Sequence, residues 1–127
     1  MNSNYWNDQA SPVLPISAPD FMPREQLGRM QLYRLQALVQ YTYDRVELFR
    51  NRCKERGVAP GHIKKLADIA LLPTFTKTDL RDTYPFGLFA APIKDIVRFH
   101  ASSGTTGKPI VVAYTKDDLR LWSECVQ

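Results

Sequence analysis

The sequence predicts a mixed α/β fold in which a helical N-terminal region leads into a β-hairpin. Apolar residues recur at helical spacing between residues 24 and 56. Residues 110–114, by contrast, form a continuous β-branched and apolar run, which is typical of a strand buried on both faces. A short stretch rich in Ser, Thr and Gly precedes that run, and its composition is that of a turn or loop.

The N-terminal region divides into a lead-in and two helices. Residues 1–22 hold three prolines and many small polar residues, so we expect an extended lead-in. Pro23 is typical of a first helical turn, and Gly57 of the position after a helix end. One helix over this span would be unusually long, so we expect a break near Asp44 and Arg45. The predicted apolar face comprises Leu35, Leu38, Val39, Val46, Phe49 and Cys53.

Local signals place the remaining elements. Residues 63–70 predict a short helix that ends before Pro73. Thr76 and Asp79 have the spacing of a capping box, which predicts a helix from residue 77 to Tyr84. Residues 86–89 are apolar and are expected to pack into a core. Strands are expected over residues 95–101 and 110–114, and a second capping box predicts a helix from residue 115 onward.

Composition narrows the class of protein. The 127 residues are 44% hydrophobic and 24% charged, which is ordinary for a soluble globular protein. No apolar run approaches the ~20 residues of a membrane helix, and no secretory signal pattern opens the chain. Cys53 and Cys125 suggest buried free thiols, and neither combines with a histidine at metal-ligand spacing. The net charge is +4, and because acidic residues interleave the basic ones, a solvated helix face is expected.

The stretch between the two predicted strands carries the chemistry. Glycines allow successive backbone N–H groups to point inward around an anion, and hydroxyls and a lysine add further donors. The spacing differs from the usual P-loop, which has four residues between its first glycine and the Gly-Lys pair. From the residues alone, a phosphate cradle and a flexible Ser/Thr/Gly loop both remain open. The candidate phosphate-binding residues are Ser102, Ser103, Gly104, Thr105, Thr106, Gly107 and Lys108.

Residues 102–109, Ser-Ser-Gly-Thr-Thr-Gly-Lys-Pro, resemble the phosphate-binding signature of the adenylate-forming acyl-CoA synthetases. The similarity is greatest to the phenylacetate–CoA ligase branch. Residues 72–82 and 84–90 resemble the segment that precedes the signature in that branch. Many members of the superfamily have a lysine after the loop proline, whereas this chain has Ile110. The phenylacetate branch also lacks that lysine, so the difference supports the assignment.

The resemblance implies an AMP-forming acid–thiol ligase of phenylacetate degradation. ATP and a carboxylate give an acyl-adenylate, and coenzyme A then displaces AMP. The loop would hold the β- and γ-phosphates, Mg²⁺ would bridge phosphates, and no metal is assigned to side chains of this chain. Catalytic residues are expected beyond Gln127, so 1–127 is expected to be an inactive N-terminal fragment, incomplete as a fold. The implied division is 1–22 lead-in, 23–94 helical region and 95–127 start of the AMP-binding domain.

Two other interpretations of the sequence remain open. The acid could be another aryl acid of the same superfamily, because the acid pocket is expected outside this chain. A non-catalytic basic helical module that binds anions or nucleic acid is the alternative from a different class. The ligase interpretation implies small-molecule partners, no nucleic acid or membrane, a cytoplasmic location, and a homodimer as one option for the complete enzyme.

Overall fold

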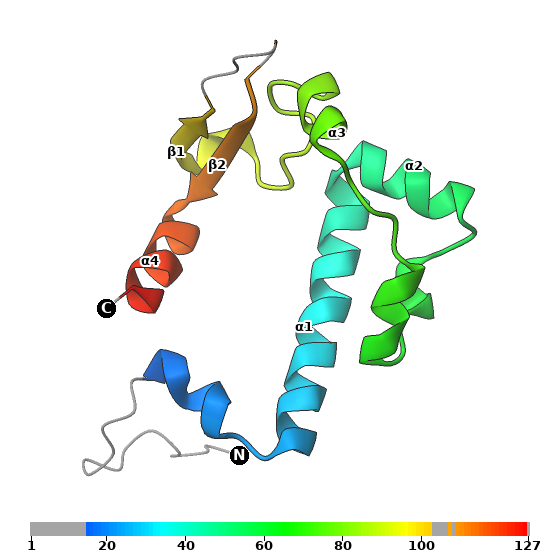
Figure 1. The fold of residues 1–127 in the computed structure, drawn as a ribbon, viewed down its shortest axis with the longest axis vertical. Coiled ribbons are helices and arrows are strands. Elements are labelled where there is room, and N and C mark those ends of the chain that lie inside the picture. The colour runs from blue at the N-terminus through cyan, green and yellow to red at the C-terminus, as the bar shows by residue number, and fades with distance from the viewer. Residues whose placement is uncertain (1–14, 103–106, 108, 127) are drawn as a thin grey trace.

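The computed structural model describes residues 15–102, 107 and 109–126. Helix α1 (Arg24–Arg45) runs along the long axis of the molecule (Figure 1). On one side of it lie α2 (Glu47–Glu55) and the 3-10 turns η2 (Pro60–His62) and η3 (Leu66–Leu71), and α3 (Lys77–Asp82) lies above its upper end in this view. On the other side lie the strands β1 (Ile96–Ala101) and β2 (Val111–Thr115) and helix α4 (Lys116–Cys125). The predicted helical region followed by a hairpin is confirmed.

The segment before α1 differs from its prediction. Pro15–Phe21 form a 3-10 helix (η1), so the expectation of an extended lead-in is wrong for these residues. Proline fixes φ near −65°, which a 3-10 turn accommodates as well as an extended chain does. The N–H of Met22 closes the turn by donating to the carbonyl of Pro19 at 3.2 Å. Residues 1–14 of the predicted lead-in lie outside the described residues.

The predicted break in the long helical span is confirmed at Val46. This residue has extended dihedrals, φ −107° and ψ 105°, between α1 and α2. A helix end leaves carbonyls without partners inside the helix. The guanidinium of Arg50 donates to two of them, the carbonyls of Tyr43 at 3.1 Å and Asp44 at 3.2 Å. Gly57 then follows α2 with φ +66°, the left-handed conformation that glycine adopts without strain.

The core forms where α1 meets α2. Its buried residues are Val39, Val46, Phe49, Cys53 and Ile63, of which Cys53 and Ile63 are fully buried. Four of these five were predicted from the helical spacing. Leu38, also predicted for the apolar face, is 61% exposed instead. The contacts of α1 with α2 and with the η2 and η3 turns leave this side chain largely exposed.

Two arginines at the C-terminal end of α2 bond the segment that follows. Arg52 bonds the carboxylate of Asp79 and, at 2.9 Å, the carbonyl of Thr74. Arg56 donates to the carbonyl of Leu71 at 3.1 Å. These bonds connect α2 to residues 71–79. The predicted solvated face holds for Arg56, which is exposed, whereas Arg52 is partly buried in its pair with Asp79. Backbone carbonyls and a carboxylate accept hydrogen bonds from these guanidinium groups.

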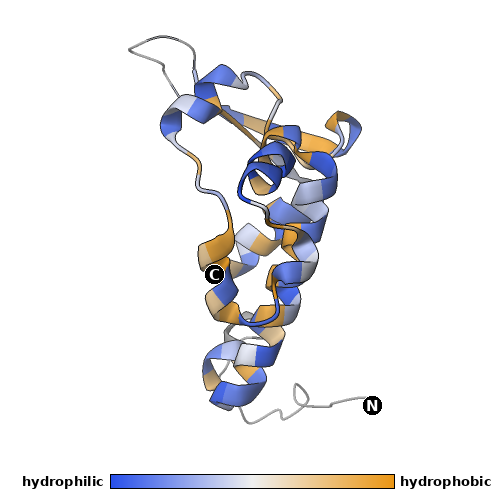
Figure 2. Ribbon diagram, turned by 90° about the vertical axis from the view of Figure 1, so that its right-hand side faces the viewer, coloured by the Kyte–Doolittle hydropathy of each residue, from blue (hydrophilic) through white to orange (hydrophobic). Residues whose placement is uncertain are grey.

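The hairpin carries apolar residues on strands that this chain only partly covers. Strands β1 and β2 pair antiparallel, with His100 opposite Val112 and Phe99 opposite Ala113. Hydrophobic segments, orange in Figure 2, occur on the helices as well as in the upper part of the molecule, where the hairpin lies. Phe99 remains 48% exposed and Val112 41% exposed, so the prediction that residues 110–114 are buried on both faces is wrong for the described chain. The apolar pattern is that of a strand within a larger sheet, while the described residues supply only one neighbour for each strand.

The segment between α3 and the hairpin is less buried than predicted. Leu88 packs against the core, as expected, but Phe86 is 46% exposed. The Phe86 ring instead contacts the rings of Phe89 and Phe99, with centroids 5.4 Å and 6.1 Å away. Residues 86–89 therefore pack on the hairpin as well as on the helical core.

Candidate functional site

The hairpin brings the two ends of the candidate loop together. The N–H of Ser102 donates to the carbonyl of Ile110 at 2.9 Å, which extends the strand ladder by one step. The N–H of Ile110 in turn donates to the hydroxyl oxygen of Ser102 at 3.1 Å. Both backbone groups of Ile110 are thus bound to one serine. These two bonds close the mouth of the loop and leave residues 103–109 as the connection between the strands.

Gly107 requires its glycine for a conformational reason. Its φ is +129°, a region that residues with a Cβ rarely adopt. A Cβ built at this position meets no heavy atom within 4 Å. A side chain at position 107 would therefore strain the backbone although space is available.

The structure describes two of the seven predicted phosphate-binding residues. Ser102 bonds Ile110 where the loop begins and ends. The composition of the loop did not predict this role, because the role depends on the strand register. Gly107 has a positive φ of +129°. The remaining predicted residues, which lie outside the described residues, are Ser103, Gly104, Thr105, Thr106 and Lys108.

His100, two residues before Ser102, belongs to an aromatic cluster. Its ring lies edge-on to Tyr114 and to Trp122, with centroid distances of 5.1 Å and 6.2 Å. Tyr114 and Trp122 stack on each other at 5.7 Å. These contacts join β1 and β2 to α4. The imidazole therefore has a packing role at the base of the loop.

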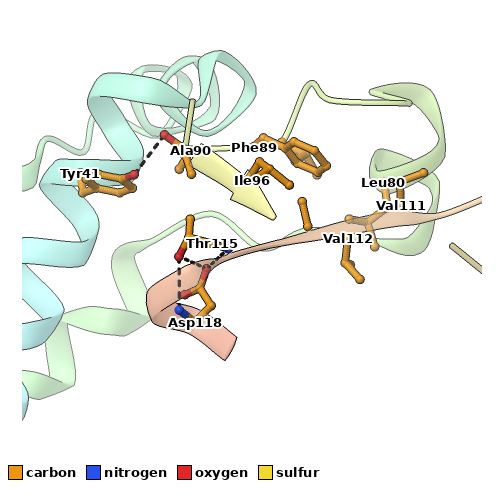
Figure 3. Close-up of a pocket in the computed structure, with 12 residues that line it drawn as sticks. Tyr41, Leu80, Phe89, Ala90, Ile96, Val111, Val112, Thr115 and Asp118 are labelled. Atoms are coloured by element: carbon orange, nitrogen blue, oxygen red, sulfur yellow. Dashed lines mark hydrogen bonds between the residues drawn. The ribbon is translucent and has the colours of Figure 1, made fainter. Parts of the chain in front are cut away.

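A cavity of about 480 Å³ lies between the end of α1, residues 88–91 and the hairpin (Figure 3). Its lining is mostly aliphatic and aromatic, including Phe89, Ile96 and Val111. The polar groups at its edge are already bonded. The Tyr41 hydroxyl donates to the carbonyl of Ala90 at 3.2 Å, and the Asp118 carboxylate accepts the N–H of Thr115 at 2.8 Å. A ligand site needs polar groups that are free to bind a ligand. Because the polar groups of this cavity are already bonded, we interpret it as a packing surface.

The described part of the chain has neither a metal site built from His, Cys, Asp and Glu side chains nor a membrane-spanning helix. No group of three or more His, Cys, Asp or Glu side chains there is arranged to hold a metal ion. No helix among the described residues is long and apolar enough to span a bilayer. Both cysteines are free thiols; Cys53 is buried, as predicted, but Cys125 is exposed, so that prediction is wrong for it.

Comparison with known proteins places the sequence among CoA ligases. No family model matches the chain. Curated relatives do match: the phenylacetate-coenzyme A ligase of Thermus thermophilus is 52% identical over 105 residues, 83% of this chain and 24% of the relative. The corresponding Pseudomonas putida enzyme is 47% identical over 80% of this chain and 23% of its own length. The Escherichia coli enzyme is 43% identical over the same shares.

Solved structures agree with the sequence comparison. A crystal structure of 2-hydroxyisobutyryl-CoA ligase in complex with 2-HIB-AMP and CoA superposes with a TM-score of 0.72 at 33% identity. The match covers 78% of this chain and 22% of that one. The same ligase in the postadenylation state gives a TM-score of 0.69 at 30% identity. This chain is similar to phenylacetate-coenzyme A ligases over 80% or more of its own length, and it spans about a quarter of the length of the curated relatives it matches.

Proposed function

We propose that this chain is the ATP-phosphate-binding segment of a complete phenylacetate–CoA ligase. The observation that carries the proposal is the closed loop between β1 and β2. Its ends are held by the two bonds between Ser102 and Ile110, and Gly107 has φ +129°, which a residue with a Cβ rarely adopts. The identity to phenylacetate-coenzyme A ligases supports this assignment.

In the proposed reaction, an oxygen of the phenylacetate carboxylate attacks the α-phosphorus of ATP. The bond to the pyrophosphate oxygen breaks, and negative charge accumulates on the leaving group. Backbone N–H groups from Gly104 to Gly107, the hydroxyls of the loop and the Lys108 ammonium would stabilise that charge. A donor placed on developing charge contributes about 3 kcal/mol to such a step. Mg²⁺ would enter as the MgATP complex and be held through phosphate oxygens.

The second half of the reaction belongs to the rest of the ligase. The thiol of coenzyme A would attack the acyl carbon, and AMP would leave to give the thioester. A solved neighbour contains both an acyl-AMP and CoA, which supports this sequence of steps. We assign no catalytic residue to this chain, because its proposed contribution is binding. Residues 95–127 then open the nucleotide-binding domain, and residues 23–94 form the helical region that supports it.

The acid and the setting are further parts of the proposal. Phenylacetate is favoured over other aryl acids by the names of four curated relatives at 43–52% identity. The reaction consumes ATP and coenzyme A, which favours the cytoplasm, and a homodimer remains a prediction. A nucleic-acid-binding role is disfavoured, because Arg50, Arg52 and Arg56 donate to groups of this chain.

The test is phenylacetate-dependent ATP–pyrophosphate exchange by the complete ligase. Substitution of Lys108 by Ala should slow exchange, because the loop loses its cation. Lys94→Ala is the matched control, since Lys94 is an exposed lysine that precedes β1. Equal exchange rates in the two variants would show that Lys108 does not bind the phosphates.

A further inference from the structure

Aromatic rings lie on both faces of β1 just before the candidate loop. Successive side chains of a strand point to opposite faces, so Phe99 and His100 lie on different sides of β1. Phe86 and Phe89 pack against the Phe99 ring, with centroids 6.1 Å and 6.2 Å away. Rings from β2 and α4 pack against His100 on the opposite face. Each described strand has one strand neighbour, and a lone hairpin is marginally stable, so these rings supply rigidity that the two strands lack.

The rings of His100, Tyr114 and Trp122, called here the hairpin cluster, lie on the face of β1 from which the loop is closed. Ser102 follows His100 by two residues, and its N–H continues the strand ladder, so both side chains point to the same face. The Ser102 hydroxyl accepts the N–H of Ile110 at 3.1 Å. A change in the position of His100 is therefore transmitted along β1 to the bonds that close the loop.

Trp122 reaches the hairpin cluster because α4 begins directly at the end of β2 (Figure 1). Thr115 is both the last residue of β2 and the N-cap of α4, and the Asp118 carboxylate accepts its N–H and its hydroxyl, both at 2.8 Å. These bonds fix the direction in which the helix leaves the strand. Trp122 lies four residues after Asp118, on the same face of α4. Its ring stacks on Tyr114, with the centroids 5.7 Å apart and an interplanar angle of 21°.

The hairpin cluster lies outside the buried core. Trp122 is 47% exposed, and none of the buried residues of the described chain belongs to β1, β2 or α4. Removal of the Trp122 ring should therefore leave the helical core folded while it releases both strands from α4. The effect of such a change should be confined to the hairpin and the loop.

We infer that Trp122 is a positioning residue for MgATP binding in the complete ligase. It acts through the Tyr114 and His100 rings, which fix the base of the hairpin. The base of the hairpin in turn sets the bonds between Ser102 and Ile110, and these hold the two ends of the loop where the phosphates bind. This inference rests on the proposed function, because it requires that MgATP binds at the loop.

The kinetics of ATP–pyrophosphate exchange by the complete ligase test the inference. Trp122→Ala should raise KM for MgATP by about tenfold, the effect of one lost hydrogen bond, because the donors of the loop are misplaced. KM for phenylacetate should not change. Trp122→Phe keeps a ring that can stack on Tyr114 and should restore most of the affinity. Leu121→Ala is the matched control, because Leu121 is a comparably exposed residue of α4 outside the hairpin cluster. A wild-type KM for MgATP in Trp122→Ala, or an equal rise in Leu121→Ala, would overturn the inference.

A double variant distinguishes a shared path from general loosening. If Trp122 acts through Ser102, then Ser102→Ala should raise KM for MgATP less in the Trp122→Ala ligase than in the wild type. Effects that simply multiply would contradict the shared path. Hydrogen exchange over α1 should be unchanged in every variant, which shows that the core is folded.

Lys108→Ala in the same assay reports on the proposed function separately. Slow exchange in Lys108→Ala, together with a wild-type KM for MgATP in Trp122→Ala, would overturn the positioning role alone. Wild-type exchange in Lys108→Ala, together with a raised KM in Trp122→Ala, would contradict phosphate binding by Lys108 and leave the positioning role in place.

Discussion

The guanidinium of Arg52 on α2 donates hydrogen bonds to both carboxylate oxygens of Asp79, on the first turn of α3. The pair is largely enclosed, with the Asp79 side chain 13% exposed. Asp79 also accepts the N–H of Thr76 at 2.6 Å as part of the capping box. The guanidinium lies 4.9 Å from the centre of the Phe75 ring, which stacks on Phe49 of the core. One carboxylate thus fixes both the start of α3 and its position on α2.

Asp79→Asn should loosen α3 from α2. The variant keeps the size of the side chain but leaves the Arg52 guanidinium without its charged partner. Amide hydrogen exchange over residues 75–83 should accelerate, while exchange over α1 should not change. Asp82→Asn is the matched control, because Asp82 is exposed at the end of the same helix. Equal exchange in the two variants would contradict a fastening role for the pair.

The same carboxylate predicts a dependence of stability on pH. The bond from Arg52, and then the N–H of Thr76, hold the pKa of Asp79 well below its usual value of 3.8. A lowered folded-state pKa means that the stabilisation is complete above pH 3.8 and is lost as the pH falls further. Exchange over residues 75–83 should therefore be slow at pH 5 and accelerate below about pH 3.8, after correction for intrinsic rates. The acceleration should be absent in Asp79→Asn.

Ile63 is the buried core residue that follows α2 in the described chain. Its truncation should lower the stability of the fold strongly. Ile63 is 1% exposed, and its carbonyl accepts a hydrogen bond from Gln36 of α1 at 2.8 Å. Ile63→Ala should lower the free energy of unfolding by about 2–5 kcal/mol, because a buried cavity forms. Ile69→Ala, at a position that is 58% exposed, should cost less than about 1 kcal/mol. Urea unfolding followed by helical circular dichroism measures both.

Ser102 should act on the loop through Ile110. Ser102→Ala removes the oxygen that accepts the Ile110 N–H, and exchange of that amide should accelerate. In the complete ligase, KM for MgATP should rise by up to about tenfold, which corresponds to the net strength of one hydrogen bond. Ser102→Thr keeps the oxygen and should restore both quantities. Faster Ile110 exchange without a change in KM would show that closing the mouth of the loop does not assist phosphate binding.

Local signals predicted the helices well. Both capping boxes, Thr76 with Asp79 and Thr115 with Asp118, are present, and each opens a helix at the following residue. The break at Val46 and the stop at Gly57 were also predictable. Each of these features depends on residues within a few positions of one another, so the sequence carries the whole signal.

Contacts between residues far apart in the sequence could not be predicted. Arg52 and Asp79 are 27 residues apart, and only the packing of α2 against α3 brings them together. The role of Ser102 likewise depends on the register of β1 with β2, which places its hydroxyl beside the Ile110 N–H. The sequence also did not predict that Phe99 and Val112 are exposed. Their apolar pattern reflects a larger sheet than the described residues form.

Phenylacetate-dependent ATP–pyrophosphate exchange tests the central claim most directly, because it isolates the step in which the loop would bind phosphates. In the complete ligase, Lys108→Ala should slow exchange by about 10²-fold, while Lys94→Ala should not. Gly107→Val should also slow it, because a β-branched residue at φ +129° costs about 1–3 kcal/mol of backbone strain. Hydrogen exchange over α1 should be unchanged in all three variants, which shows that the fold is intact. Wild-type exchange rates in both Lys108→Ala and Gly107→Val would contradict the account.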